Sequence, residues 1–285
     1  FQVKFIKKKF FKLENKKIRL KSRKVFNSVK DYIPWMCYTK YYRGSFENLD
    51  KYKYIIYAHS FTDAQLGHGY DGFANTFDWL KYTIERLNAK NVNFIIKAHP
   101  NFYINTKIGS MHERSRWDQK IYYNLINKYS SYDNILLINK PVENIDVIKR
   151  LNKKCVVLTH HGSVQLEMIY NNFKIISSVC NIIDPKYKLT NTWKNKKEYQ
   201  NLLNQNWDKL KFSHKNNYLN IIHNLFINKN SYYGENAFMH QLRKKMIKKN
   251  YIKKDSSYEE TLSRFNSLKN KDDILKNIKI IIEKI

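Results

Sequence analysis

Short apolar runs alternate with amphipathic segments along the middle of this sequence, and this alternation is typical of a parallel α/β sheet. Five of the runs have the length and the β-branched or aromatic content of buried strands. The predicted strands are Tyr54–Ala58, Asn93–Lys97, Ile135–Asn139, Cys155–Thr159 and Lys174–Ser178. The segments between and after them predict helices near Phe73–Asn88, Trp117–Ser130, Asn144–Leu151, Ser163–Tyr170 and Lys196–Asn204.

This order predicts an α/β fold with a Rossmann-like parallel sheet over residues 51–206. Residues 1–50 are basic and weakly patterned, so we interpret them as the tail of an upstream domain or as a linker. Residues 207–285 have a lysine-rich helical pattern and predict a carboxyl-terminal helical extension. Its helices are expected near Asn216–Asn228, Ala237–Lys249 and Asp272–Ile285. The first residue is Phe1 and the βαβ pattern begins only near Lys53, so we expect the chain to be a fragment of a longer protein.

Two of the predicted strands end in a cluster of polar residues. The strand at residues 93–97 runs into Lys97-Ala-His-Pro100, and the strand at residues 155–159 runs into Thr159-His-His-Gly-Ser163. Ligands of open parallel sheets bind outside the carboxyl ends of the strands, so we expect both motifs to face one ligand site.

In the first motif, strand alternation places Lys97 and His99 on the same face, and Pro100 ends the strand. A cation beside an imidazole suits a phosphate oxygen, and the imidazole can donate a hydrogen bond or a proton to a departing phosphate. The alternative is a capped strand end with a solvated lysine.

In the second motif, Gly162 permits a tight turn into a helix, and Ser163 is a suitable N-cap whose neighbouring amides could bind an anion. Glu167 lies one turn further along the same helix face and could accept hydrogen bonds from ribose hydroxyls. The alternatives are a serine that only caps the helix and a glutamate that is only a solvated surface carboxylate.

A third polar segment, His59-Ser-Phe-Thr-Asp63, follows the first strand, and a glycine-rich stretch, 67–72, comes after it. Asp63 is a candidate base for removing a proton from an acceptor hydroxyl, and His59 is the second candidate. Alternatively, Asp63 only caps the next helix.

The formal net charge of +29 would favour a nucleic-acid partner. However, lysine is spread along the whole chain, and no helix-turn-helix, zinc-finger or RNP pattern accompanies it. We therefore expect no nucleic acid, and we interpret the charge as attraction to an anionic donor or to anionic lipids, as in a cytoplasmic protein at the inner face of a membrane.

Several other kinds of site lack their sequence patterns. His68, His112, His160 and His161 do not have a compact metal-ligand spacing, so we expect no metal and no cofactor. The chain contains no GxGxxG, Walker or GxSxG motif. Its three cysteines are widely separated, which fits a reducing compartment.

Taken together, these motifs resemble those of bacterial capsule polysaccharide biosynthesis proteins, the group that contains the Kdo transferases. The resemblance covers roughly residues 53–180 and rests on His59-x-Phe-Thr-Asp63, Phe77-Asp-Trp-Leu80, Lys97-x-His-Pro100 and His161-Gly-Ser163 with Glu167. The Lys-x-His-Pro element is also similar to the His-Pro motif of bacterial sialyltransferases. The chain departs from the family at His160-His161, where a serine- or threonine-rich pair is usual, and in having only about fifty residues before the first strand.

The resemblance implies a metal-independent glycosyltransferase of the GT-B type that moves Kdo or another 2-keto acid sugar from a CMP-sugar to a polysaccharide or glycolipid acceptor. This chain would be its donor-binding half. The implied donor-binding residues are Lys97, His99, Pro100, Thr159, His161, Gly162, Ser163 and Glu167. Two alternatives stay open: a transferase of glycerol or ribitol phosphate that uses a CDP-alditol, and a non-catalytic module that binds a glycan or a nucleotide.

Overall fold

The computed structural model describes residues 46, 49–62, 69–99, 102, 111–140, 142–180, 189–212, 242–253, 256, 258–271 and 274. These residues belong to two compact units, of which the larger is Tyr38–Tyr218. The smaller unit combines Phe1–Cys37 with Leu219–Ile285.

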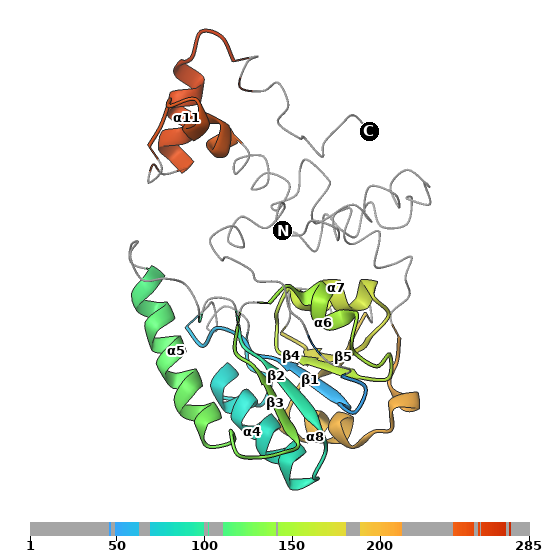
Figure 1. Ribbon diagram of the computed structural model, residues 1–285. Helices are drawn as coiled ribbons and strands as arrows, with labels where there is room; N and C mark the ends of the chain where they lie inside the picture. The colour runs from blue at the N-terminus through green and yellow to red at the C-terminus, as the bar shows by residue number, and fades with distance from the viewer. Residues whose placement is uncertain are drawn as a thin grey trace. The chain divides into compact units, whose positions relative to one another are not determined.

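The larger unit is built on a six-stranded sheet whose paired strands are all parallel (Figure 1). Its strands are β1 (Tyr54–Tyr57), β2 (Phe94–Lys97), β3 (Ile135–Ile138), β4 (Val156–Thr159), β5 (Lys174–Ser178) and β6 (Asn191–Trp193). The strand order is β3-β2-β1-β4-β5-β6, which is the order of the doubly wound Rossmann fold. The predicted α/β class is therefore confirmed, and each predicted strand lies within one residue of an observed one.

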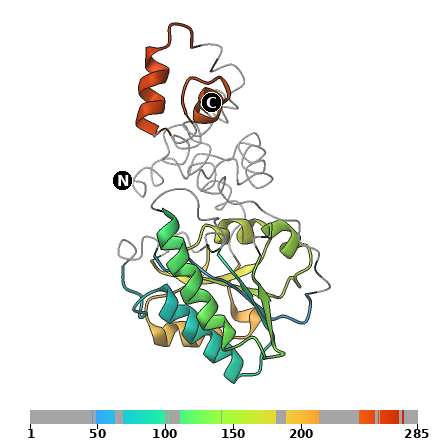
Figure 2. The ribbon, with the colours of Figure 1, turned by 60° about the vertical axis from the view of Figure 1, so that its left-hand side comes forward.

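Helices cover both faces of the sheet (Figures 1 and 2). One face carries α4 (Thr76–Ala89), α5 (Met111–Asn127) and α8 (Lys196–Asn204), and the other carries α6 (Asn144–Ile148) and α7 (Val164–Tyr170). The change of face between α5 and α6 occurs where the chain crosses from β3 to β4. This crossover makes the boundary between β1 and β4 the topological switch point of the sheet.

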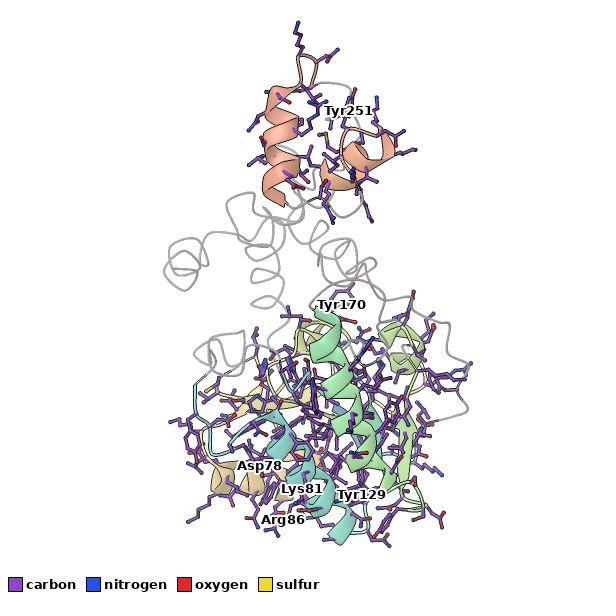
Figure 3. All side chains as sticks on the ribbon, turned by 90° about the vertical axis from the view of Figure 1, so that its left-hand side faces the viewer. Asp78, Lys81, Arg86, Tyr129, Tyr170 and Tyr251 are labelled. Carbon is purple, nitrogen blue, oxygen red and sulfur yellow. The ribbon has the colours of Figure 1, made fainter. Side chains whose placement is uncertain are left out.

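Helix α4 shows why the first face is buried. Trp79 and Leu80 are fully buried in the core, whereas Lys81 and Arg86 lie on the outer face of the helix (Figure 3). The helix begins at Thr76 rather than at Phe73 because the side chain of Asn75 accepts a hydrogen bond from the Asp78 amide, at 2.8 Å.

An aromatic cluster fills the core between α4, β6 and α8. The rings of Trp79 and Trp193 are stacked at 6.2 Å between centroids, and Tyr199 lies 4.5 Å from Trp193. The Tyr199 hydroxyl is hydrogen-bonded to the Thr83 hydroxyl at 2.7 Å. These contacts join α8 to α4, so the last part of the unit closes over the same face as the first helix.

Strand β6 and the start of α5 also differ from the predictions. Strand β6 was not predicted because Asn191-Thr-Trp193 is short and polar; Asn191 donates its side-chain amide to the Ile175 carbonyl at 3.0 Å. Helix α5 begins at Met111 rather than at Trp117, so residues 111–116 are helical as well.

The smaller unit contains a helical stretch at 242–248 and α11 (Tyr258–Ser267). Leu242, Met246, Phe265 and Ile274 form its buried cluster. The helical stretch agrees with the prediction over residues 237–249, whereas α11 was not predicted. The predicted helices at residues 216–228 and 272–285 lie outside the described residues, apart from a helical Ile274. None of the helices in the described part of the chain has both the length and the apolar character that crossing a membrane requires.

Candidate functional site

The segments that leave β1, β2 and β4 emerge side by side at the carboxyl edge of the sheet. The register pairs Tyr57 of β1 with Lys97 of β2 on one side and with Thr159 of β4 on the other. His59, His99 and His161 each lie two residues beyond one of these paired positions. The fold therefore brings these three predicted site residues to the switch point, where sheets of this order bind ligands.

His59, His99 and His161 form what we call the imidazole cluster. The ring centroid of His59 lies 3.8 Å from that of His161 and 5.4 Å from that of His99. His59 and His161 are buried, whereas His99 is half-buried. His99 is thus the outermost member of the cluster, and His59 lies between the other two rings.

Burial lowers the pKa of His99 well below its usual value, and the neighbouring His59 and Lys97 lower it further. His99 is therefore neutral at pH 7. A phosphate placed beside it would oppose all three effects and favour the charged imidazolium. His99 is thus suited to an anion, although it carries little charge before the anion arrives.

Lys97 is not a solvated lysine at an open strand end, because only 2% of the residue is exposed. Its Nζ lies 5.7 Å from the ring centroid of Tyr57. Burial lowers the pKa of Lys97 to about 8, and the charge of Glu167 partly opposes this shift. Lys97 therefore acts from inside the protein, beside β1 and near α7.

Glu167 is also not a solvated surface carboxylate. It is half-buried, and its Oε2 accepts a hydrogen bond from Asn144 Nδ2 of α6 at 2.9 Å. Burial raises the pKa of Glu167, while the Asn144 hydrogen bond and the charge of Lys97 lower it. The charges of Lys97 in β2 and Glu167 in α7 thus attract each other at the same edge of the sheet.

The turn into α7 is tight around Gly162. A Cβ at this position would lie 3.0 Å from Thr159 Oγ1 and 3.7 Å from His59 Cδ2, so glycine permits the chain to pass close to the cluster. Ser163 occupies the N-cap position, but its side chain makes no capping hydrogen bond with the helix. The interpretation of Ser163 as a capping side chain is therefore wrong. The remaining predicted site residues, Asp63 and Pro100, lie outside the described residues.

A buried hydrogen-bonded group that was not predicted from the sequence lies behind the cluster. His160 Nε2 lies 2.9 Å from Asp71 Oδ2, and the two Nδ1 atoms of His160 and His161 lie 2.8 Å apart. Asp71 also accepts hydrogen bonds from the Ser178 hydroxyl and, at 3.3 Å, from the Phe73 amide. Two signals could have indicated this group: the second histidine of the motif, and an aspartate flanked by glycine in a loop after β1. Within the described residues, no group of three or more His, Cys, Asp or Glu side chains could hold a metal ion.

A pH-dependent stability test follows from the burial of Lys97. The folded protein binds the Lys97 proton less tightly than the unfolded chain does, so the unfolded chain holds more protons above pH 8 and the free energy of unfolding rises there. Relative to Lys97→Met, the free energy of unfolding of the natural chain should rise by roughly 1 kcal/mol between pH 7 and pH 9. Urea denaturation of both proteins at the two pH values measures this. A difference that stays constant with pH would contradict the burial of a charged lysine.

No protein-family model matches the sequence, and no curated protein matches it. Among solved structures, the chain is similar to the beta Kdo 2,4 transferase KpsC of Thermosulfurimonas dismutans, with 10% identity and a TM-score of 0.44 over 74% of this chain and 56% of that one. It is also similar to the UDP-GlcNAc 2-epimerase of Methanocaldococcus jannaschii in complex with UDP-GlcNAc and UDP, with 19% identity, a TM-score of 0.36, and 78% and 51% covered. A further structure of that epimerase gives 17% identity and a TM-score of 0.38, with 74% and 49% covered. The chain thus spans about half the length of the solved structures that it matches.

Proposed function

We propose that this chain is the donor-binding half of a metal-independent GT-B glycosyltransferase that uses a CMP-sugar. The observation that carries the proposal is the convergence of His59, His99 and His161 at the switch point of a Rossmann-ordered sheet. The motifs that supply these histidines are those that resemble capsule polysaccharide biosynthesis proteins. The proposed sugar is Kdo or another 2-keto acid sugar, and the proposed acceptor is a surface polysaccharide or a glycolipid.

In this proposal, the nucleotide phosphate contacts His99, the half-buried member of the imidazole cluster. When the bond between the sugar carbon and the phosphate oxygen breaks, the electron pair stays on the phosphate, which gains one negative charge. A protonated imidazole beside that oxygen stabilises the developing charge. Glu167, which accepts a hydrogen bond from Asn144, would accept further hydrogen bonds from the ribose hydroxyls.

The proton of the acceptor hydroxyl needs a base. Asp63 is our first candidate and His59 the second, since both follow β1 in the sequence. A GT-B site lies between two domains, so we propose that acceptor binding depends on a partner domain. The net charge of +29 supports a place in the cytoplasm near anionic lipids at the inner face of the membrane.

His99→Ala tests the phosphate contact. Loss of one charge-assisted hydrogen bond should weaken CMP binding by about 1.5–3 kcal/mol, which is roughly a 10- to 150-fold rise in Kd. Isothermal titration calorimetry measures the affinity, and Lys81→Ala on the exposed face of α4 is the matched control, expected to bind like the natural chain. Unchanged CMP affinity in the His99 variant would remove His99 from the site.

The same titration, together with an assay of sugar transfer, separates the proposed function from the alternatives. Preference for CMP over CDP supports a CMP-sugar donor, whereas preference for CDP favours a CDP-alditol transferase. Binding of CMP without sugar transfer when acceptor and partner domain are supplied favours a non-catalytic binding module. Absence of binding to any cytidine nucleotide contradicts the proposed function.

A further inference from the structure

Behind the imidazole cluster, a continuous chain of hydrogen bonds leads into the interior of the sheet. It runs from His161 to His160, from His160 to Asp71, and from Asp71 to Ser178 of β5. All four residues are buried. The hydrogen bonds from both sides converge on the Asp71 carboxylate, and a carboxylate that is ionised can only accept hydrogen bonds. This carboxylate therefore determines which nitrogen carries the proton on each ring.

Asp71 is ionised in the folded protein. Burial raises the pKa of its carboxyl group, but the hydrogen bond and the charge of His160, with the hydrogen bonds of Ser178 and the Phe73 amide, bring the pKa below its usual value. His160 Nε2 must then donate to Asp71 Oδ2, across 2.9 Å. A neutral His160 consequently has no hydrogen on Nδ1, because a neutral imidazole carries only one.

The same reasoning fixes the two neighbouring rings. His160 Nδ1 accepts from His161 Nδ1 across 2.8 Å, so a neutral His161 carries its hydrogen on Nδ1 and a lone pair on Nε2. His59 Nδ1 lies 3.0 Å from the Ser60 carbonyl oxygen and must donate to it. A neutral His59 therefore also has its lone pair on Nε2.

We propose that Asp71 and His160 are positioning residues that hold neutral His161 with its proton on Nδ1, so that the imidazole cluster binds a phosphate only together with a proton. The lone pairs on Nε2 of His59 and His161 repel a phosphate oxygen, whereas a protonated ring attracts it. This inference rests on the nucleotide-binding function proposed above. It adds that nucleotide binding and proton uptake are one event.

The hydrogen-bonded pair of His161 and His160, which we call the relay, also determines where the positive charge of the added proton resides. When His161 gains a proton on Nε2, its Nδ1 proton can pass to His160 Nδ1, and the positive charge then lies against the Asp71 carboxylate. A charge nearer the surface would be opposed by Lys97, the last residue of β2, which acts on the neighbouring His99 ring 5.4 Å from that of His59. Glu167 of α7 partly balances Lys97. Asp71 is thus the carboxylate that contacts the relay directly, through His160, and it stabilises the positive charge there.

Asp71→Asn should reverse the relay. The Phe73 amide donates to Oδ1 of Asp71, so an asparagine there keeps its oxygen at that position and turns its NH₂ group toward His160. His160 Nε2 would then accept, its Nδ1 would donate to His161, and His161 Nε2 would carry a hydrogen without any added proton. The same kind of tautomer reversal follows Asp→Asn replacement in serine protease triads.

The first experiment reads the tautomers directly in the ligand-free chain. Long-range ¹H–¹⁵N correlation spectra distinguish Nδ1–H from Nε2–H, and His160→Gln and His161→Gln identify the two sets of signals. We expect the proton on Nε2 of His160 and on Nδ1 of His161, with both reversed in Asp71→Asn. The opposite tautomers in the natural chain would overturn the inference.

The second experiment measures proton uptake with CMP as the probe, by calorimetry in two buffers of different ionisation enthalpy at pH 7.5. We expect about one proton taken up per CMP and an affinity that falls about tenfold per pH unit above neutrality. Both effects should be largely lost in Asp71→Asn and kept in Asp78→Asn, a matched replacement in the first turn of α4. Binding of CMP without proton uptake would overturn the inference. Absence of CMP binding would instead contradict the proposed function, and the tautomer spectra would still decide the role of Asp71.

Discussion

Replacement of Trp193 by alanine is expected to lower the free energy of unfolding by about 3–5 kcal/mol, the usual cost of deleting a large buried aromatic side chain. Trp193 is fully buried, and its ring contacts Trp79, Tyr199 and, at 5.7 Å between centroids, the ring of His160. The cavity would remove the packing that joins β6 to α4 and α8. It would also remove a ring that packs against His160 and helps to hold His160 in the orientation in which its Nε2 contacts Asp71.

Urea denaturation of the larger unit, followed by far-UV circular dichroism, measures this loss. Tyr70→Ala is the matched control, because Tyr70 is 78% exposed and its removal should change stability by less than about 0.5 kcal/mol. A second variant, Trp193→Phe, should recover part of the stability because it keeps a ring in the cluster. If Trp193→Ala costs no more stability than Tyr70→Ala, the aromatic cluster does not hold β6, α4 and α8 together.

Gly72→Ala is expected to cost about 2–5 kcal/mol, for two reasons that add. Gly72 has a φ of +98°, a backbone region in which a Cβ costs about 1–2 kcal/mol. A Cβ there would also lie 2.4 Å from the Lys196 amide nitrogen and 2.8 Å from the Asn195 carbonyl carbon, so the backbone before α8 would have to move. Overpacking of this kind costs about a further 1–3 kcal/mol.

Gly69→Ala separates these two contributions. Gly69 has a similar φ of +87°, but a Cβ there would meet only the side-chain sulfur of Cys180, at 3.3 Å. We expect it to cost only the backbone strain, about 1–2 kcal/mol. Thermal and urea unfolding of the two variants give the comparison. Equal losses in the two variants would show that the contact of Gly72 with the start of α8 contributes nothing.

The sheet could be predicted from the sequence because its strands are continuous apolar runs. Ile135-Leu-Leu-Ile138 of β3 has no other plausible state between two amphipathic segments. Strand β6 lacks this signal, because Asn191 contributes a side-chain hydrogen bond to the Ile175 carbonyl and not a buried apolar side chain. The start of α5 was also missed, because residues 111–116 contain more polar than apolar side chains.

The three histidines of the cluster could be predicted because each follows a predicted strand. The burial of Lys97 could not be predicted. Strand alternation indicates the face of the sheet on which a side chain lies, but not how deeply the packed helices and loops bury it. Asp71 was overlooked for a different reason. It meets His160 across a long sequence separation, and a short loop flanked by two glycines indicates only that the chain turns there.

The position of β4 has a consequence for how the protein folds. β4 pairs with β1 and not with the strand that precedes it in the sequence, so the sheet consists of two groups, β1-β2-β3 and β4-β5-β6, each with local connections. Contacts between residues close in sequence form faster than contacts between distant ones. The pairing of β1 with β4 joins the two groups, and this β1–β4 seam is therefore expected to form last. Both seam strands carry fully buried aliphatic side chains, which stay exposed until the seam closes. Slow closure would therefore lengthen the time in which newly made chains can aggregate through these edges.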